Sequence, residues 1–495
     1  MFRLKGIPKT LVLTLYLILG VGVEAQQPFD VDTTFRCGFN DWYVNSILTF
    51  DNGQVLASGQ IKVPGELVHR TGVRLDQDGT IDPTYPIVAF MGGKLTPWQD
   101  RIYTKSGASV RRIHTDGTLD ASFNMIGTPY FGAQQGGDYH VFPDGRILMS
   151  GAHNLHDSVR GFVGIYDLIW FTNTGRLDTT RIHRRASGAI YEIAPMDNGQ
   201  FLCYGTGDIY EGQPVGGIFR VNADGSLDTT LYCQLRWGEA YSILPLPDGR
   251  FYAAGIYSFS NGPLNIIRLA RFLPNGDLDP TFDNAIDFDL GEIPDPGFGA
   301  TVARVRPWEN GSILVMGTYQ FVNGEPRRGI CVIDSTGQLT DLFDGCGVGP
   351  YTYQGFTYGS VAGYLEDDNG MAYIWGAYHG YNDGTTNDTL QRFVTRLYGP
   401  DFTTSVREPE VLEKQFSVYP NPAAEMVTFN YNFKTEPEMA FVIVRDAMGR
   451  EVSTIAMPNK QGQLVLDTRQ LTKGMYAVSY TNAGATLHVD RLIVR

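Results

Sequence analysis

One phrase recurs along this chain between Asn52 and Gly376: a polar turn, usually Asp-Gly or Asn-Gly, followed by a short apolar strand that ends in glycine. Such turns between apolar runs are the strongest short-range hairpin signal, because a two-residue turn needs positive φ angles that Gly and Asn tolerate. A second phrase, a turn followed by Leu-Asp and often Thr-Phe, alternates with the first. The seven copies of the first phrase occupy residues 52–59, 99–107 (a degenerate copy), 144–151, 198–205, 248–255, 310–317 and 369–376.

Each repeat predicts a four-stranded antiparallel meander. In the fifth repeat we expect strands at residues 240–246, 250–255 and 266–273, and a short fourth strand at 277–282. A lone meander of this size cannot hide both faces from water, so the repeats must stack face to face, and the twist of each sheet favours a radial arrangement. The sequence therefore predicts an all-β fold with a seven-bladed β-propeller over residues 26–402.

The ends of the repeat region leave two ways to close the ring. Residues 29–35 are typical of the fourth strand of a blade, and the last repeat ends on its third strand at residues 393–398. The favoured closure places the first segment in the last blade, which leaves no open edge. The alternative uses residues 400–404 as a local fourth strand.

The interleaved phrases resemble the delta-60 repeat, a bacterial β-propeller repeat family, over about residues 28–402. This resemblance implies the propeller fold and carries no established activity. Two repeats depart from the pattern. The second has Pro97, Trp98 and Gln99 at its turn, and the sixth has Thr340 in place of the repeat aspartate.

The start of the chain has the layout of a secretory signal peptide. Arg3, Lys5 and Lys9 precede an apolar run at residues 11–23, and we expect cleavage between Ala25 and Gln26. Thirteen apolar residues are too few for a bilayer, which needs about 20, and no later run is apolar enough to span one. Removing residues 1–25 takes away three basic residues and one glutamate, so the formal net charge moves from −14 to −16. Such an acidic chain predicts no nucleic-acid partner.

Export would place the five cysteines in an oxidising compartment. Cys37, Cys233 and Cys346 follow the repeat aspartate position by five or six residues, so we expect them at matching places in different blades, too far apart to bond together. Cys331 with Cys346 and Cys203 with Cys233 are candidate bridges. The connectivity stays open, because spacing alone does not determine it.

A second domain follows a charged linker at residues 403–415. Residues 416–495 contain about seven short alternating strands, which predict a small antiparallel β-sandwich.

Three motifs lie in order at residues 418–422, 446–452 and 471–476. They resemble the C-terminal sorting domain (type A) of the type IX secretion system, and the resemblance runs along all 80 residues. The resemblance implies that the secretion machinery recognises the domain, that the protein crosses the outer membrane, and that the domain is then typically removed, leaving the propeller secreted or attached to the cell surface. The alternative is an ordinary sandwich domain with a ligand of its own. The motif residues are Tyr419, Pro420, Asn421, Pro422, Gly449, Gly474 and Tyr476.

No motif predicts a metal, a cofactor or a catalytic residue. His153, His156 and Asp157 could offer ligands to a cation, but we expect them in a solvated loop. The acidic stretch 283–295, with Asp287 and Asp289 among its carboxylates, favours a surface connector over a calcium site. Aspartates in the hairpin turns are expected to cap their own backbone.

Topology predicts where a ligand would bind. The tight first and third turns of each meander lie at one end, so the longer second-to-third loops and the connectors between blades form a variable rim at the other. Aromatic rings beside polar side chains on this rim suit sugar or peptide recognition. The same rings could instead pack between blades. The candidate rim residues are Trp42, Trp237, Tyr353, Tyr257, Tyr319 and Tyr378.

Three functions remain open on this basis. The first is a non-catalytic surface or secreted protein that binds a glycan, a peptide or an envelope protein. The second is an extracellular hydrolase or lyase acting on a polysaccharide, and the third is a structural part of the envelope. Only the first has residues that point to it.

Overall fold

The computed structural model describes residues 27–125, 130–260, 262–295, 297, 299–401, 416–433, 437, 439–482 and 485–495. The predicted cleavage site at Ala25 and Gln26 and the predicted linker at 403–415 lie outside the described residues. The fold is all-β, with only two helical turns in the described residues, η1 (Glu309–Gly311) and η2 (Thr468–Gln470). The chain divides into two compact units, one at Gln26–Phe402 and one within Thr403–Arg495.

Each repeat of the larger unit forms an antiparallel meander whose strands pair in sequence order. The short loops and connectors add further strand pairs. The meander strands are β1 (Asp41–Thr49), β2 (Val55–Lys62) and β3 (Arg70–Leu75); β4 (Leu95–Trp98), β5 (Arg101–Ser106) and β6 (Ser109–His114); β7 (Phe131–Val141), β8 (Ile147–Asp157) and β9 (Phe162–Phe171); β10 (Ile190–Pro195), β11 (Phe201–Gly205), β14 (Ile218–Val221) and β15 (Leu227–Cys233); β16 (Trp237–Pro245), β17 (Phe251–Ser258) and β18 (Ile267–Phe272); β20 (Thr301–Pro307), β21 (Ile313–Thr318) and β24 (Ile330–Ile333); and β28 (Ser360–Glu366), β29 (Met371–Asn382) and β30 (Asn387–Tyr398). The short strands are β12 (Ile209–Tyr210), β13 (Gln213–Pro214), β19 (Phe288–Asp289), β22 (Phe321–Val322), β23 (Glu325–Pro326), β25 (Gly347–Val348), β26 (Tyr351–Tyr353) and β27 (Phe356–Tyr358).

The predicted fourth strands are shorter than expected. In the fifth repeat, residues 277–282 make only one bridge, between Leu278 and Phe272. The chain turns immediately afterwards, because the carboxylate of Asp279 accepts a hydrogen bond from the backbone N–H of Thr281 (2.9 Å). Only the fourth repeat has a full fourth strand, β15, among the described residues.

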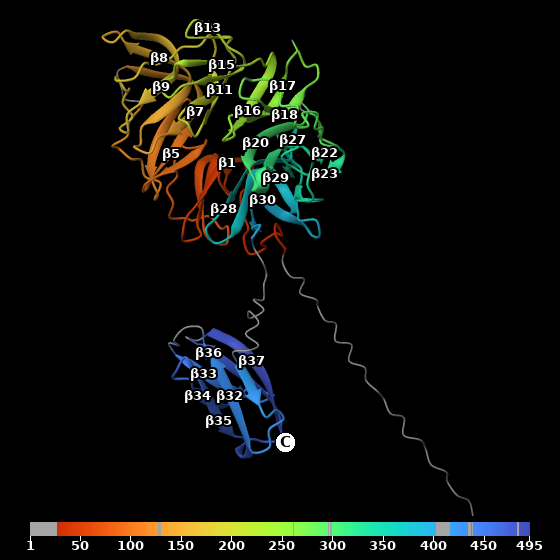
Figure 1. Cartoon of the computed structure of the whole chain (residues 1–495). Coiled ribbons are helices and arrows are strands. Elements are labelled where there is room, and N and C mark those ends of the chain that lie inside the picture. The colour runs from red at the N-terminus through yellow and green to blue at the C-terminus, as the bar shows by residue number, and fades with distance from the viewer. Residues whose placement is uncertain are drawn as a thin grey trace, which may run out of the picture. The chain divides into compact units, whose positions relative to one another are not determined.

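The first segment closes the propeller. Val31 bridges Leu397 in β30, and backbone hydrogen bonds join Phe29 to Tyr398 (2.8 Å) and Asp32 to Arg396 (3.0 Å). The prediction that residues 29–35 supply the fourth strand of the last repeat is confirmed. In Figure 1 the chain colour accordingly runs from red through green to cyan within this unit, and β1 lies near β28 to β30.

The first strands of the repeats form the inside of the ring. β1 contacts β4 and β28, β10 contacts β7 and β16, and β20 contacts β16 and β28. A hydrogen bond between the hydroxyls of Thr96 in β4 and Tyr139 in β7 (3.1 Å) completes the circuit. A bridge between Thr318 and Ser360 merges the strands of the last two repeats into one sheet, so the pairing alone does not set the number of blades. Seven blades stays a prediction.

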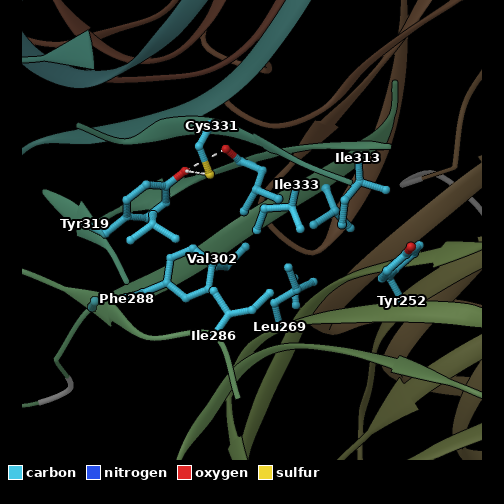
Figure 2. Packing of buried hydrophobic residues seen from close by; sticks show 14 of the residues in the cluster. Tyr252, Leu269, Ile286, Phe288, Val302, Ile313, Tyr319, Cys331 and Ile333 are labelled. Carbon is cyan, nitrogen blue, oxygen red and sulfur yellow. Dashed lines mark hydrogen bonds between the residues drawn. The ribbon is translucent and has the colours of Figure 1, made fainter. Parts of the chain in front are cut away.

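Apolar side chains fill the space between neighbouring repeats. β17 is buried along its whole length, because both of its faces pack against other repeats. Figure 2 shows the cluster between the fifth and sixth repeats, where Tyr252 and Leu269 meet Val302, Ile313 and Ile333. Burial on both faces explains why the second strands are continuous apolar runs instead of alternating ones.

In every repeat except the second, the repeated glycine of the second strand lies where two backbones approach closely. At Gly255 a β-bulge between Ala240 and Ser242 brings β16 towards β17. An added Cβ at Gly255 would lie 2.1 Å from the carbonyl oxygen of Glu239, so no side chain fits.

The smaller unit is an antiparallel β-sandwich, as predicted. One sheet contains β31 (Phe416–Tyr419), β32 (Met426–Asn432) and β35 (Gln461–Asp467). The other has the order β34 (Glu451–Ala456), β33 (Ala440–Arg445), β36 (Gly474–Asn482) and β37 (Ala485–Val494). Their inner faces bury one apolar cluster that includes Phe429, Val442, Val478 and Leu492.

Candidate functional site

The aspartates of the hairpin turns serve the framework, as expected. The carboxylate of Asp78 accepts hydrogen bonds from the backbone N–H and the hydroxyl of Thr80 (2.9 and 2.6 Å), and Asp224 is bound in the same way by Ser226. These carboxylates cap their own turns.

The repeat aspartates bind an arginine that the sequence analysis missed. Asp279 Oδ2 accepts a hydrogen bond from Arg271 Nε (2.7 Å), and another N–H of this arginine donates to the carbonyl oxygen of Ser335 in the next repeat (2.6 Å). The same link, from arginine to aspartate and to the following repeat, joins Arg74 to Asp82 and Thr115, Arg112 to Asp120 and Asn173, Arg220 to Asp228 and Pro274, and Arg396 to Asp32 and Gln77. In four of these five links the arginine stands eight residues before the aspartate, and this spacing is the sequence signal for the link.

Two repeats lack the link. Val332 stands in the arginine position of the sixth repeat, where the aspartate is also replaced by Thr340. In the third repeat Trp170 takes the arginine position, and the Asp178 carboxylate accepts hydrogen bonds from Thr180 and lies 3.8 Å from Arg146. The sixth repeat therefore lacks both the aspartate and the arginine of the link.

Hydrogen bonds hold the pKa low for the repeat aspartates that bind an arginine. The hydroxyl of Thr84 lowers the pKa of Asp82 to about 2, with help from Arg74. At Asp120 burial opposes ionisation, but Ser122 and Arg112 outweigh it and lower the pKa to about 2. These carboxylates stay ionised at neutral pH, so they are poor general acids.

The two ends of the propeller differ as topology predicts. A hollow of about 620 Å³ is lined by Asn52 and Gly53 of a first turn and by Gln77 and Asp78 of a third turn, so these turns share one end, the turn end. The second-to-third loops and the connectors between repeats form the other, which we call the loop end. Three further hollows, of about 520, 490 and 440 Å³, are lined by loop-end residues of neighbouring repeats.

Trp237 lines the hollow of about 520 Å³, between the fourth and fifth repeats. One wall is the loop that carries β12 and β13, including Thr206 and Asp208, and the other is the connector from Gln234 to Gly238. Trp237 is half-buried and Arg236 is exposed. We call this site the Trp237 hollow.

The structure brings Trp42 and Tyr353 together elsewhere, between the first and last repeats. Their ring centroids are 4.8 Å apart, and His69 lies 6.1 Å from Trp42. Tyr351 of the same hairpin donates its hydroxyl to Asp41 Oδ1 (2.6 Å). The rings of Trp42 and Tyr353 cover part of each other, so a ligand could contact only their outer faces. Neither residue lines the Trp237 hollow.

The assignment of Tyr257, Tyr319 and Tyr378 to an exposed rim is wrong, because all three side chains are fully buried. Each hydroxyl donates to the backbone carbonyl four residues earlier in the same segment, at 2.9, 2.7 and 3.2 Å. Figure 2 shows Tyr319 inside the apolar cluster, also bonded to Cys331 Sγ. Burial raises the pKa of these phenols, and they belong to the packing between repeats.

His153 and His156 do not form a cation site. They lie in β8, where we expected a loop, and alternation along the strand buries His153 but exposes His156. His153 accepts a hydrogen bond from the Gln134 N–H and contacts the Ser150 carbonyl (3.1 Å), while Asp157 pairs with Arg160. Burial lowers the pKa of the His153 imidazole.

The acidic stretch alternates in the same way. Ile286 and Phe288 are buried while Asp287 and Asp289 face solvent, because β19 lies over the core of the sixth repeat. Within the residues that the structure describes, no three His, Cys, Asp or Glu side chains are grouped so that they could hold a metal ion. The five cysteines are all buried free thiols, so neither candidate bridge is formed.

A charged group that connects several repeats was also missed. Lys94 pairs with Asp138 (3.1 Å), and Glu192 lies on the first strand of the fourth repeat, β10. Burial and the neighbouring Asp138 raise the pKa of Glu192, while Lys94 and Arg304 of other repeats oppose the rise. The signal in the sequence is a lone acid within the apolar run 190–195.

The sorting motif of the smaller unit binds the last strand. Asn421 Oδ1 accepts a hydrogen bond from the Ile493 N–H (3.0 Å), and its amide donates to the Arg491 carbonyl. The backbone of Ala423 bonds to Ile493 (2.7 Å) and Arg495 (2.9 Å). Asn421 therefore covers the edge of β37. The other motif residues lie in the same unit: Tyr419 on β31, Pro420 and Pro422 beside Asn421, Gly449 in the turn after β33, and Gly474 and Tyr476 on β36.

Two family models match parts of the chain. The secretion system C-terminal sorting domain matches residues 417–495, and a β-propeller domain of unknown function matches residues 204–231 and 246–282. No curated protein matches the chain. None of the helices in the described residues has the length and apolar composition of a membrane span.

Three solved structures show a distant likeness. PorZ of Porphyromonas gingivalis, a surface component of the type IX secretion system, is 14% identical, with 90% of this chain and 64% of that chain covered and a TM-score of 0.36. The extracellular domain of a putative hybrid two-component system of B. thetaiotaomicron is 12% identical, with 92% and 56% covered and a TM-score of 0.38. The Pan2 WD40 domain of Neurospora crassa is 10% identical, with 76% and 99% covered and a TM-score of 0.38.

The chain thus spans less than two thirds of the first two of these structures. The sorting domain directs export by type IX secretion to the cell surface or the extracellular space. The chain is a β-propeller protein that carries a C-terminal sorting domain of the type IX secretion system.

Proposed function

We propose that the exported propeller is a non-catalytic binding protein that holds an extracellular glycan, peptide or envelope protein at its loop end. The hollows between neighbouring repeats at this end carry the proposal, because their volumes of about 440 to 520 Å³ suit small ligands or ligand segments. They are walled by loops and connectors, the parts of a repeat fold that vary most freely. Partly exposed aromatic rings, Trp42, Trp237 and Tyr353, lie at the same end.

The second candidate is a hydrolase or lyase acting on a polysaccharide. Glu192 favours it, because a carboxyl whose pKa burial raises could donate a proton to a leaving group. Against it, Lys94 neutralises the neighbouring Asp138 (3.1 Å). The turn-end carboxylates are occupied by Arg, Ser and Thr partners, so they do not add to this group.

Binding and turnover can be measured on the same sample. The mature chain, from residue 26 to the C-terminus, is applied to a glycan array and a peptide array, and its activity on soluble polysaccharides is followed by release of reducing ends. Binding without turnover supports a binding protein. Turnover that is lost in Glu192→Gln refutes it in favour of the enzyme, and silence in every assay leaves only a structural role.

A further inference from the structure

The Trp237 hollow is built by two walls that are fixed independently of any ligand. Tyr210 in the hairpin β12–β13 is fully buried, and its hydroxyl donates to the Gly225 carbonyl (2.6 Å). The hydroxyl of Tyr204 donates across to the Gly238 carbonyl on the opposite wall (2.9 Å). A hollow held in this way loses little entropy when a ligand enters.

The floor of the hollow is backbone. Gly216 and Gly217 lie so close to the connector that an added Cβ would be 2.1 Å from the Cys233 carbonyl oxygen and 2.9 Å from the Leu235 side chain. Glycine there allows the two walls to meet at the base without a side chain between them. The two walls therefore meet at Gly216 and Gly217, while Gln234 and Arg236 of the lining are exposed to solvent.

The side chains around the mouth combine one flat apolar ring with paired polar groups. Trp237 offers a half-buried indole. Arg236 donates to Gln234 Oε1 (2.8 Å), which leaves most of its N–H groups free, and Asp208 accepts from the Ser187 hydroxyl (3.0 Å). An indole face beside neighbouring donors and acceptors matches a sugar ring, which has apolar C–H faces and a rim of hydroxyl groups.

The charge of the site decides between neutral and anionic sugars. Arg236 and Asp208 are the charged side chains that line the hollow, and their charges cancel. The chain without its signal segment carries a formal charge of −16, which repels anionic ligands at a distance. A hydroxyl-rich ligand without charge avoids this repulsion and can use both polar groups.

We propose that the Trp237 hollow binds a neutral oligosaccharide segment, with the indole of Trp237 stacked on one sugar ring and Arg236, Gln234 and Asp208 bonded to its hydroxyls. This inference rests on the proposed binding function and names its ligand class and its site. It excludes the Trp42–Tyr353 cluster as the principal glycan site.

Isothermal titration calorimetry of the mature chain tests this with two sets of probes. The neutral set is cellohexaose, mannohexaose, xylohexaose and laminarihexaose, and the anionic probe is oligogalacturonate. We expect at least one neutral probe to bind and oligogalacturonate to bind at least tenfold more weakly. Trp237→Ala should weaken the neutral probe about 10- to 100-fold, as expected for loss of one stacked aromatic ring.

Two further variants complete the test. Trp42→Ala tests the competing site, the Trp42–Tyr353 cluster, and the affinity should stay within about twofold if the glycan binds in the Trp237 hollow. Arg236→Gln changes an exposed side chain, so it should fold normally and weaken neutral probes about tenfold by loss of charged hydrogen bonds. This variant keeps the test informative if Trp237→Ala fails to fold.

Several results would overturn the inference. They are tighter binding of oligogalacturonate than of every neutral probe, unchanged affinity in both hollow variants, loss of binding in Trp42→Ala alone, or no glycan binding at all. If peptides bind while glycans do not, the inference fails and the binding function stands. If neither glycans nor peptides bind, the inference and the proposed binding function are both refuted.

Discussion

Removing one arginine from the ring of inter-repeat links should destabilise the propeller strongly, and removing its aspartate as well should restore much of the loss. Arg271 and Asp279 are the test pair, because their side chains are only 4% and 2% exposed. The sixth repeat of the same chain shows which residues can replace the pair. The sixth repeat has Val332 and Thr340 at the two positions, and the Thr340 hydroxyl donates to the Val332 carbonyl (3.0 Å).

The structure sets the expected magnitudes. Arg271→Val leaves a buried carboxylate with one remaining cation, Arg250 (3.0 Å), and it removes the bond to Ser335 of the next repeat. Breaking a buried ion pair typically costs 3–5 kcal/mol, so we expect about 3 kcal/mol with Arg250 still present. In Arg271→Val with Asp279→Thr no charge is orphaned, and the expected loss is about 1 kcal/mol.

The free energy of unfolding of the mature chain and the three variants is measured by urea titration, with tryptophan fluorescence and circular dichroism as probes. The double-mutant cycle should show a coupling energy of about 2 kcal/mol or more between the two sites. If the double variant is as unstable as the sum of the two single variants, the ion pair is not a coupled unit and the reasoning fails.

Three further predictions concern other parts of the chain. The pKa of Asp82 and Asp120 is about 2, below the ordinary value of 3.8. Their contribution to stability is therefore present above about pH 4 and is lost as the pH falls towards 2. Measuring the free energy of unfolding as a function of pH checks this, and no change between pH 4 and pH 2 would contradict it. Asn421→Ala should cost the sorting unit about 1–2 kcal/mol and speed hydrogen exchange at the Ile493 amide, measured by mass spectrometry; unchanged exchange would show that the edge of β37 is held by other bonds. Gly255→Ala should lower the melting temperature by calorimetry more than an alanine at an exposed turn position, because its Cβ would lie 2.1 Å from a carbonyl oxygen.

The sequence predicted the features that depend on local chemistry. Asp-Gly and Asn-Gly turns report the backbone angles of the residues that carry them, so the meanders and the two ends of the ring followed from the pattern. The sandwich fold followed from its alternating strands and its sorting role from its motifs. The closing role of residues 29–35 followed from the repeat register, which the bridge between Val31 and Leu397 confirms.

Features that depend on contacts between repeats were harder to predict. Tyr257 follows the terminal glycine of its strand, where a loop would begin by pattern, but the strand continues to Ser258 and buries the ring. Arg271 lies eight residues before Asp279, a distance that becomes a contact only when the third strand turns back on itself. The Trp237 hollow is assembled from two repeats, so no single stretch of sequence describes it.

The closing bridge has a consequence for the order of assembly. Arg396 and Asp32 share a hydrogen bond across 364 residues, so the sheet that holds the first segment cannot be finished before the last repeat exists. Until then the first segment has no partner strand, so its backbone can pair with a neighbouring molecule. An internal deletion within the last repeat that keeps the sorting domain therefore also frees the first segment of the propeller, and export measured on such a chain would report on an open ring.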